Sequence, residues 1–109
     1  TLRHARAAGV GVGAHPSFPD LQGFGRRPMQ LPPAELEAVL IYQMAALAGM
    51  AQAEGVKMGH VKPHGALSNM ACTDAALART VVTAIRAFDA DLILLALGHL
   101  YVTISCSLV

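Results

Sequence analysis

Two apolar periods alternate along this chain and predict helices and strands in turn. Apolar residues recur at helical spacing over 33–55 and again over 73–88. Short apolar runs at 10–15, 57–62 and 91–97 predict strands, and the last run is apolar enough to be buried on both faces. Because strands and helices follow one another in order, we expect an α/β fold with parallel strands.

Residues at the ends of these segments support the assignments. Pro33 suits the first turn of a helix, Gly55 suits its end, and Thr73 is the expected N-cap of the next helix. Residues 1–8 also have helical spacing and stop at Gly9, but no N-cap precedes them. We therefore expect them to be the last turns of a longer helix.

A long segment, residues 16–32, separates the first predicted strand from the helix that follows it. It is rich in proline and glycine, which predicts a loop. Ordered loops of this length are uncommon in compact domains unless they are functional. In parallel α/β folds the loops after the carboxyl ends of strands carry the chemistry, and two polar motifs, starting at His15 and His60, begin at such ends.

The first polar motif runs from His15 through Asp20 to Arg26 and Arg27. Arginine presents a planar fork of donors to carboxylate and phosphate groups, and nearby glycines leave backbone N–H groups accessible. The motif therefore predicts a site for an anionic group, although an isolated arginine pair is more often a solvated surface feature. It is not a P-loop, because GxxxxGK[ST] does not occur in the chain.

The second polar motif places His60, Lys62 and His64 at alternate positions, and Asn69 follows in the expected loop 63–69. In an extended chain the first three side chains project from one face, where they are costly to bury unless they meet a ligand or one another. We expect a site for a polar substrate with one imidazole as acid or base. A metal shared by His60 and His64 is a weaker interpretation, because the Lys62 ammonium repels cations. A third interpretation is a strand end whose polar side chains are simply hydrated.

Composition narrows the classes of function. The chain is 54% apolar and 14% charged, which is typical of a globular domain, and its formal charge of +1 gives no field to attract nucleic acid or anionic lipid. Tryptophan is absent, so a stacking platform for bases is not expected. Cys72 and Cys106 lack metal-ligand spacing and fit a reducing, cytoplasmic location. The apolar run 92–109 is interrupted by polar residues and makes a poor membrane span.

The two polar motifs, taken together, resemble those of the LamB/YcsF family, to which the A subunit of bacterial 5-oxoprolinase belongs. The resemblance is carried by GAHPSFPDLQGFGRR, from Gly13 to Arg27, and HVKPHGALSN, from His60 to Asn69. It extends over about residues 1–97. It implies a fold like the β/α barrel of the polysaccharide deacetylases, of which this chain would supply about three parallel strands with alternating helices.

The resemblance also implies a reaction, namely the ATP-dependent opening of 5-oxoproline to glutamate, with magnesium, in a complex with subunits B and C. Phosphorylation of the lactam oxygen would make a better electrophile, and no protein metal ligand is expected. The residues expected to act in catalysis are His15, Asp20, His60, Lys62 and His64. The residues expected to bind substrate or phosphate are Arg26, Arg27 and Asn69.

The chain departs from the family pattern at Ser68, where the family usually has tyrosine, and it lacks the family's acidic opening strand. We therefore expect residues 1–109 to form one incomplete barrel domain, the central part of a longer one, with a divergent, strand-like tail at 98–109. Open strand edges favour self-association, and the chain alone should be inactive. Two rival hypotheses are a metal-dependent deacetylase or amidohydrolase, with His60 and His64 as ligands, and a non-catalytic assembly module.

Overall fold

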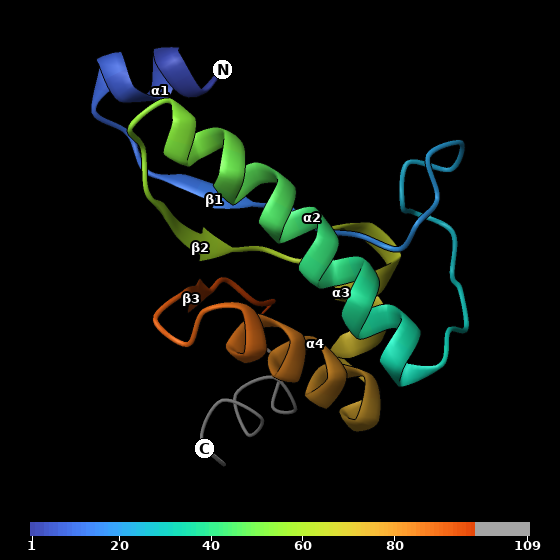
Figure 1. The fold of residues 1–109 in the computed structure, drawn as a ribbon. Helices are drawn as coiled ribbons and strands as arrows, with labels where there is room; N and C mark the ends of the chain where they lie inside the picture. The colour runs from blue at the N-terminus through green and yellow to red at the C-terminus, as the bar shows by residue number, and fades with distance from the viewer. Residues whose placement is uncertain (98–109) are drawn as a thin grey trace.

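The computed structural model describes residues 1–97, which form alternating helices and strands (Figure 1). In chain order these are α1 (Leu2–Ala8), β1 (Val12–Ala14), α2 (Pro33–Ala53), β2 (Met58–Val61), α3 (Gly65–Ala71), α4 (Ala75–Phe88) and β3 (Ile93–Leu94). The predictions made for the tail, residues 98–109, lie outside the described residues.

The three strands form one parallel sheet in the order β1-β2-β3. Gly13 of β1 lies opposite His60 of β2, and His60 lies opposite Ile93 of β3. Each strand is joined to the next by a helical connection, so the predicted α/β architecture, part of a (β/α) barrel, is confirmed. Because the strands run in the same direction, β1 and β2 end at the same edge of the sheet.

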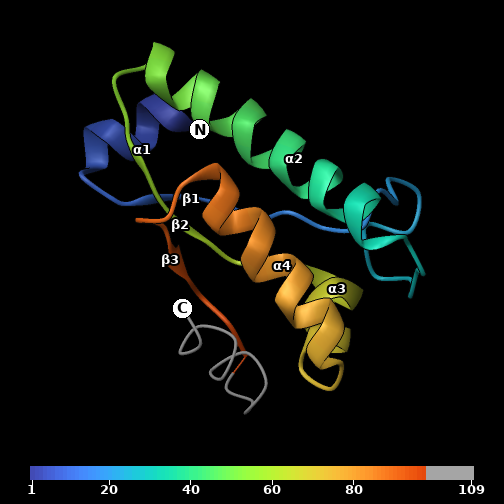
Figure 2. The ribbon, with the colours of Figure 1, turned by 60° about the horizontal axis from the view of Figure 1, so that its bottom comes forward.

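Helices α2 and α4 lie side by side over one face of the sheet (Figure 2). The core between these layers includes Leu36, Leu40 and Met44 of α2, Val61 of β2 and Ile85 of α4, all buried. By length and composition alone, α2 is apolar enough to cross a membrane. Here it packs on β1, β2 and α4, which is the arrangement of a core helix in an α/β domain.

The other face of the sheet is bare of helices within residues 1–97. Leu94 packs in the core, whereas Ile93 is 63% exposed and Leu95 45% exposed, since alternate side chains point to opposite faces. The prediction of a strand over 91–97 buried on both faces is therefore wrong for the described residues. The strand itself covers only Ile93–Leu94.

Two local predictions also need correction. Residues 63–69, predicted as a loop, contain the start of helix α3. The N-cap of α4 is Asp74 rather than Thr73: the Asp74 carboxylate accepts from the Leu77 N–H at 3.0 Å, whereas the Thr73 hydroxyl donates back to the Met70 carbonyl at 3.3 Å. An aspartate one residue later thus competes successfully for the cap.

The predicted ends at Gly9 and Gly55 are confirmed. Both glycines are left-handed, with φ of 65° and 68°, and they follow α1 and α2. The opening helix α1 docks on the end of α2, because Arg3 binds the Glu54 carboxylate and Arg6 the Glu54 carbonyl oxygen, each at 2.8 Å. These contacts fix the entry into β1 and hence the path toward the polar motifs.

Candidate functional site

The two polar motifs meet at a pair of imidazoles, His15 and His64. His15 follows directly after β1, and His64 is the N-cap residue of α3, three residues after β2. His64 Nδ1 lies 3.0 Å from His15 Nε2, and the rings meet edge to face with centroids 4.7 Å apart. The structure therefore brings the two motifs together at the carboxyl edge of the sheet, as the parallel strands predicted.

Each imidazole is held at its other nitrogen by a backbone carbonyl. His15 Nδ1 lies 2.5 Å from the Lys62 carbonyl oxygen, and His64 Nε2 lies 2.7 Å from the Phe24 carbonyl oxygen. Because a carbonyl oxygen only accepts, we infer that both of these nitrogens carry the hydrogen. The tautomers are thereby fixed, and neutral rings direct the lone pairs of His15 Nε2 and His64 Nδ1 at each other.

The imidazole pair opens into a cavity of about 800 Å³ between the 16–32 loop and α2, which we call the dyad cavity. Its wall is mainly apolar, with polar groups from three elements. The residues that line it are His15, Ser17, Phe18, Pro19, Asp20, Leu21, Phe24, Gly25, Glu35, Ala38, Val39, Tyr42, Gln43 and His64. An apolar cavity with a few converging polar groups is the usual form of a small-molecule site.

Asp20 and Arg27 form an ion pair that closes the first motif into a turn. Asp20 is only 8% exposed, and its carboxylate accepts from Arg27 Nε at 3.0 and 3.1 Å, from Arg27 Nη2, and from the Gly23 N–H at 3.0 Å. The Arg27 guanidinium lowers the pKa of Asp20 to about 2, and Asp20 in turn raises the pKa of Arg27. Among the described residues the Asp20 carboxylate is engaged by Arg27 and Gly23 and makes no hydrogen bond to a histidine, so its predicted catalytic role stays a prediction.

This ion pair leads to a prediction about acid stability. The folded-state pKa of Asp20, about 2, lies below its unfolded value of about 3.9. The pair therefore contributes its full stability above pH 4, and this contribution is lost as the pH falls toward 2. In urea unfolding, Asp20→Asn should be less stable than the wild type near neutral pH, and the difference should shrink in acid. A difference that stays constant between pH 6 and pH 2.5 would contradict this role.

Gln43 is a site residue that sequence reasoning missed. Its side-chain amide accepts from the Ser17 N–H at 3.1 Å and donates to the Ser17 carbonyl oxygen at 2.8 Å. The two bonds fasten the loop after β1 to α2 and so position His15. The available signal was a polar residue at an otherwise apolar position of a helical repeat.

Phe24 is the second missed residue. Besides its carbonyl contact, its ring meets the His64 ring edge to face at 5.0 Å, and its φ of 56° is unusual for a non-glycine residue. The guanidinium of Arg26, an expected anion ligand, lies 5.7 Å from the centre of this ring. Arg26 is exposed and does not line the dyad cavity, whereas Arg27 is engaged by Asp20.

His60 lies apart from the dyad cavity, so the expectation that alternate residues of the second motif share one site is wrong. Its ring packs over Gly13, where an added Cβ would lie 2.1 Å from His60 Cδ2. It lines a different cavity, of about 1090 Å³, beside α1 and the end of α2. Within residues 1–97, His60 and His64 line different cavities, and no group of three or more His, Cys, Asp or Glu side chains is placed to hold a metal.

Lys62 and Asn69 also lie outside the lining of the dyad cavity. Both are exposed, Asn69 on α3 and Lys62 just after β2. Lys62 contributes its backbone instead: its N–H donates to the Ala14 carbonyl at 2.9 Å, and its carbonyl accepts from His15. The predicted roles of the Lys62 and Asn69 side chains stay predictions.

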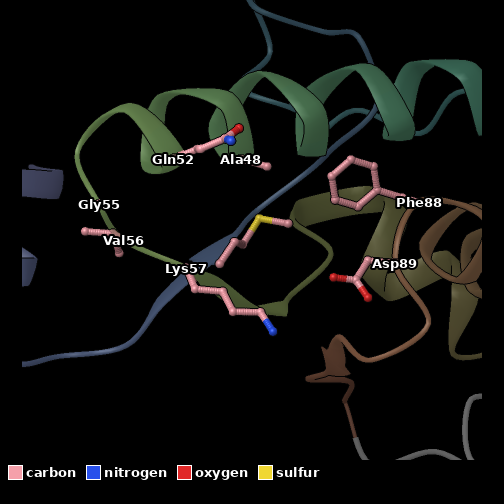
Figure 3. A pocket seen from close by; sticks show the side chains of 8 residues that line it. Ala48, Gln52, Gly55, Val56, Lys57, Phe88 and Asp89 are labelled. Carbon is pink, nitrogen blue, oxygen red and sulfur yellow. The ribbon is translucent and has the colours of Figure 1, made fainter.

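A further cavity, of about 550 Å³, lies at the opposite end of β2, between the ends of α2 and α4 (Figure 3). Its lining includes the side chains of Lys57, Phe88 and Asp89. It lies at the amino end of the strand. Because chemistry in β/α folds is found at the carboxyl end, we place the candidate site at the dyad cavity.

Comparison with known proteins now assigns the family. The sequence model of the LamB/YcsF family matches residues 1–107. The chain belongs to the LamB/YcsF family. It is 71% identical over 96 residues to the A subunit of 5-oxoprolinase from Azoarcus sp., covering 88% of this chain and 38% of that protein. It is 57% identical over 94 residues to the A subunit of 5-oxoprolinase from Methylococcus capsulatus, covering 86% and 36%.

A solved LamB/YcsF relative has the same fold. The crystal structure of the lactam utilization protein from Thermus thermophilus superposes with a TM-score of 0.92 at 48% identity. The superposition covers 97% of this chain and 43% of that one. The chain thus spans about two fifths of the length of these relatives, and the resemblance seen in the two motifs is confirmed at the level of family and fold.

Proposed function

We propose that the LamB/YcsF domain to which these residues belong acts in the ATP-dependent opening of 5-oxoproline to glutamate, as the A subunit of a 5-oxoprolinase. The proposal is carried by one observation: the two family motifs converge on the dyad cavity, in a chain 71% identical to a protein named as the A subunit of 5-oxoprolinase. In this proposal the protein is cytoplasmic, as its substrate and ATP are.

The residues of the dyad cavity suit the reaction. Opening the lactam breaks its C–N bond; the carbonyl carbon gains the oxygen of water, and the nitrogen gains a proton. ATP transfers a phosphoryl group to the lactam oxygen and leaves as ADP; water activated by His15 or His64 then adds to the activated carbon, and the phosphoryl group leaves as inorganic phosphate. Arg26 is exposed, and its guanidinium lies 5.7 Å from the centre of the Phe24 ring, which lines the cavity; in this proposal it binds the carboxylate of the substrate or a phosphate. The apolar wall leaves few competing polar groups around the five-membered ring.

Partner subunits complete the proposal. The relatives are named as A subunits, which places them in assemblies of more than one kind of chain. We assign ATP binding, with magnesium, to the complex with subunits B and C, since the chain itself contains no P-loop.

The test is a chimera. The matching 96 residues of the Azoarcus A subunit are replaced by those of this chain, and the chimera is co-expressed with the candidate subunits B and C of that organism. We expect glutamate and ADP to form only when 5-oxoproline and ATP are both present, at a rate near that of the unaltered protein. An intact complex that turns over neither substrate, beside an active unaltered control, would favour the assembly-module hypothesis instead.

A further inference from the structure

The two imidazoles of the dyad present an electrostatic conflict. Their hydrogens are used on the Lys62 and Phe24 carbonyl oxygens, so neutral rings leave two lone pairs facing each other across 3.0 Å. Two acceptors at hydrogen-bond distance repel unless something positive lies between them. Each of the two ring hydrogens is held by a backbone carbonyl oxygen, one in each of the two loops, so the arrangement depends on the path of the main chain.

We propose that His15 Nε2 and His64 Nδ1 bind a divalent first-row transition-metal ion. Metal-ligating histidines typically donate their other ring N–H to a backbone carbonyl or a carboxylate, which fixes the tautomer, and both rings do so here. Two nitrogens 3.0 Å apart, each about 2.1 Å from one ion, subtend an angle of about 90° at that ion. This angle fits neighbouring ligands of an octahedral ion, and imidazole suits Fe, Ni, Cu and Zn.

The charged residues near the dyad are of both signs. Asp20 and Glu35 line the same cavity, the Arg27 guanidinium compensates Asp20, and the Arg26 guanidinium is exposed 5.7 Å from the centre of the Phe24 ring. Among the described residues, Glu35 is therefore the acidic residue of the cavity lining that is left without such a pair. Lys62 contributes only its carbonyl oxygen to the dyad, and its ammonium is not among the groups that line the cavity. Among residues 1–97 the two imidazoles are the protein ligands, so the other coordination positions are open to oxygen atoms of water, a carboxylate or a phosphate.

A catalytic role for the bound ion rests on the proposed function, whereas the binding of the ion to the two imidazoles does not. An ion at the dyad would generate a nucleophilic hydroxide from bound water near neutral pH, or polarise the lactam oxygen. His15 and His64 would then act as ligands that place the ion at the wall of the cavity.

The test measures metal binding directly on the full chain. Metal-free protein is titrated with Co²⁺, and both the heat and the visible spectrum are recorded, since the spectrum reports coordination geometry. We expect one ion per chain in the wild type. In His15→Gln and His64→Gln the affinity should fall by more than about tenfold, because even outer-shell partners act on that scale. His4→Gln, which removes an exposed imidazole of α1, and His60→Gln should bind as the wild type does.

A second measurement needs no variant. Paramagnetic broadening by substoichiometric Co²⁺ should reach the ring resonances of His15 and His64 before those of His60. The proposal is overturned if the wild type binds no ion, if binding survives both dyad substitutions, or if His60 broadens first. It is also overturned if the dyad shows a single shared proton that millimolar Co²⁺ does not displace. Metal binding by the chain beside an inactive chimera would refute the proposed function and leave the metal site standing.

Discussion

Replacing His64 with alanine in the chimeric protein is expected to lower its 5-oxoprolinase turnover by about 10²- to 10⁴-fold, the range over which general acid–base groups act. The side chain touches His15 through Nδ1 and the Phe24 carbonyl through Nε2, so its removal takes away half of the dyad. The loss is expected whether the dyad acts through protons or through a bound ion, because both require the second imidazole. Initial rates of glutamate formation at saturating ATP measure it.

The matched control is His4→Ala, which removes an exposed imidazole on α1 and should leave the rate unchanged. Thermal unfolding of each variant, together with co-purification of its partners, separates a catalytic loss from an assembly defect. Activity within a few-fold of the parent in a folded His64→Ala complex would remove the dyad from the mechanism. The proposed function would then depend on the family assignment alone.

The sequence predicted the dyad only in part, because its two imidazoles are far apart along the chain and come together only through the pairing of β1 with β2. The strand ends were recognisable from apolar runs followed by His15 and by the second motif. Parallel pairing then placed both ends at one edge, which the structure confirms. The pattern of alternate positions also predicted that His60 would share the site. It does not: the His60 ring packs over Gly13 of the neighbouring strand, where a side chain would clash with it, and it lines a different cavity.

The remaining errors have a common cause, which is that they depend on contacts between distant segments. Helix α3 follows Pro63 and begins at Gly65, two residues that locally favour a turn, so the sequence predicted a loop. The Asp20–Arg27 pair and the Gln43 bonds to Ser17 likewise depend on how the 16–32 loop folds back. The long helix α2, by contrast, was predicted well, since its repeat, Pro33 and Gly55 are local signals.

Gly65→Ala is expected to lower the free energy of unfolding of the chain by about 2 to 5 kcal/mol. Gly65 has a φ of 63°, where a residue with a Cβ pays roughly 1–2 kcal/mol. The added Cβ would also lie 2.4 Å from the Gly25 carbonyl oxygen, so the two loops must separate. That oxygen accepts from the Ala66 N–H at 3.0 Å, and losing a partly buried hydrogen bond costs about 1–3 kcal/mol more.

Gly49→Ala gives a matched control with the opposite expected sign. Gly49 is an exposed residue inside α2, and an added Cβ there meets nothing within 4 Å, so alanine should stabilise the chain by about 0.5–1 kcal/mol. Urea unfolding of both variants measures the difference. Because Gly65 directly follows His64, the destabilised variant should also lose Co²⁺ affinity, whereas Gly49→Ala should keep it. Equal stability of the two variants would show that the contact between Gly65 and Gly25 does not hold the dyad loops together.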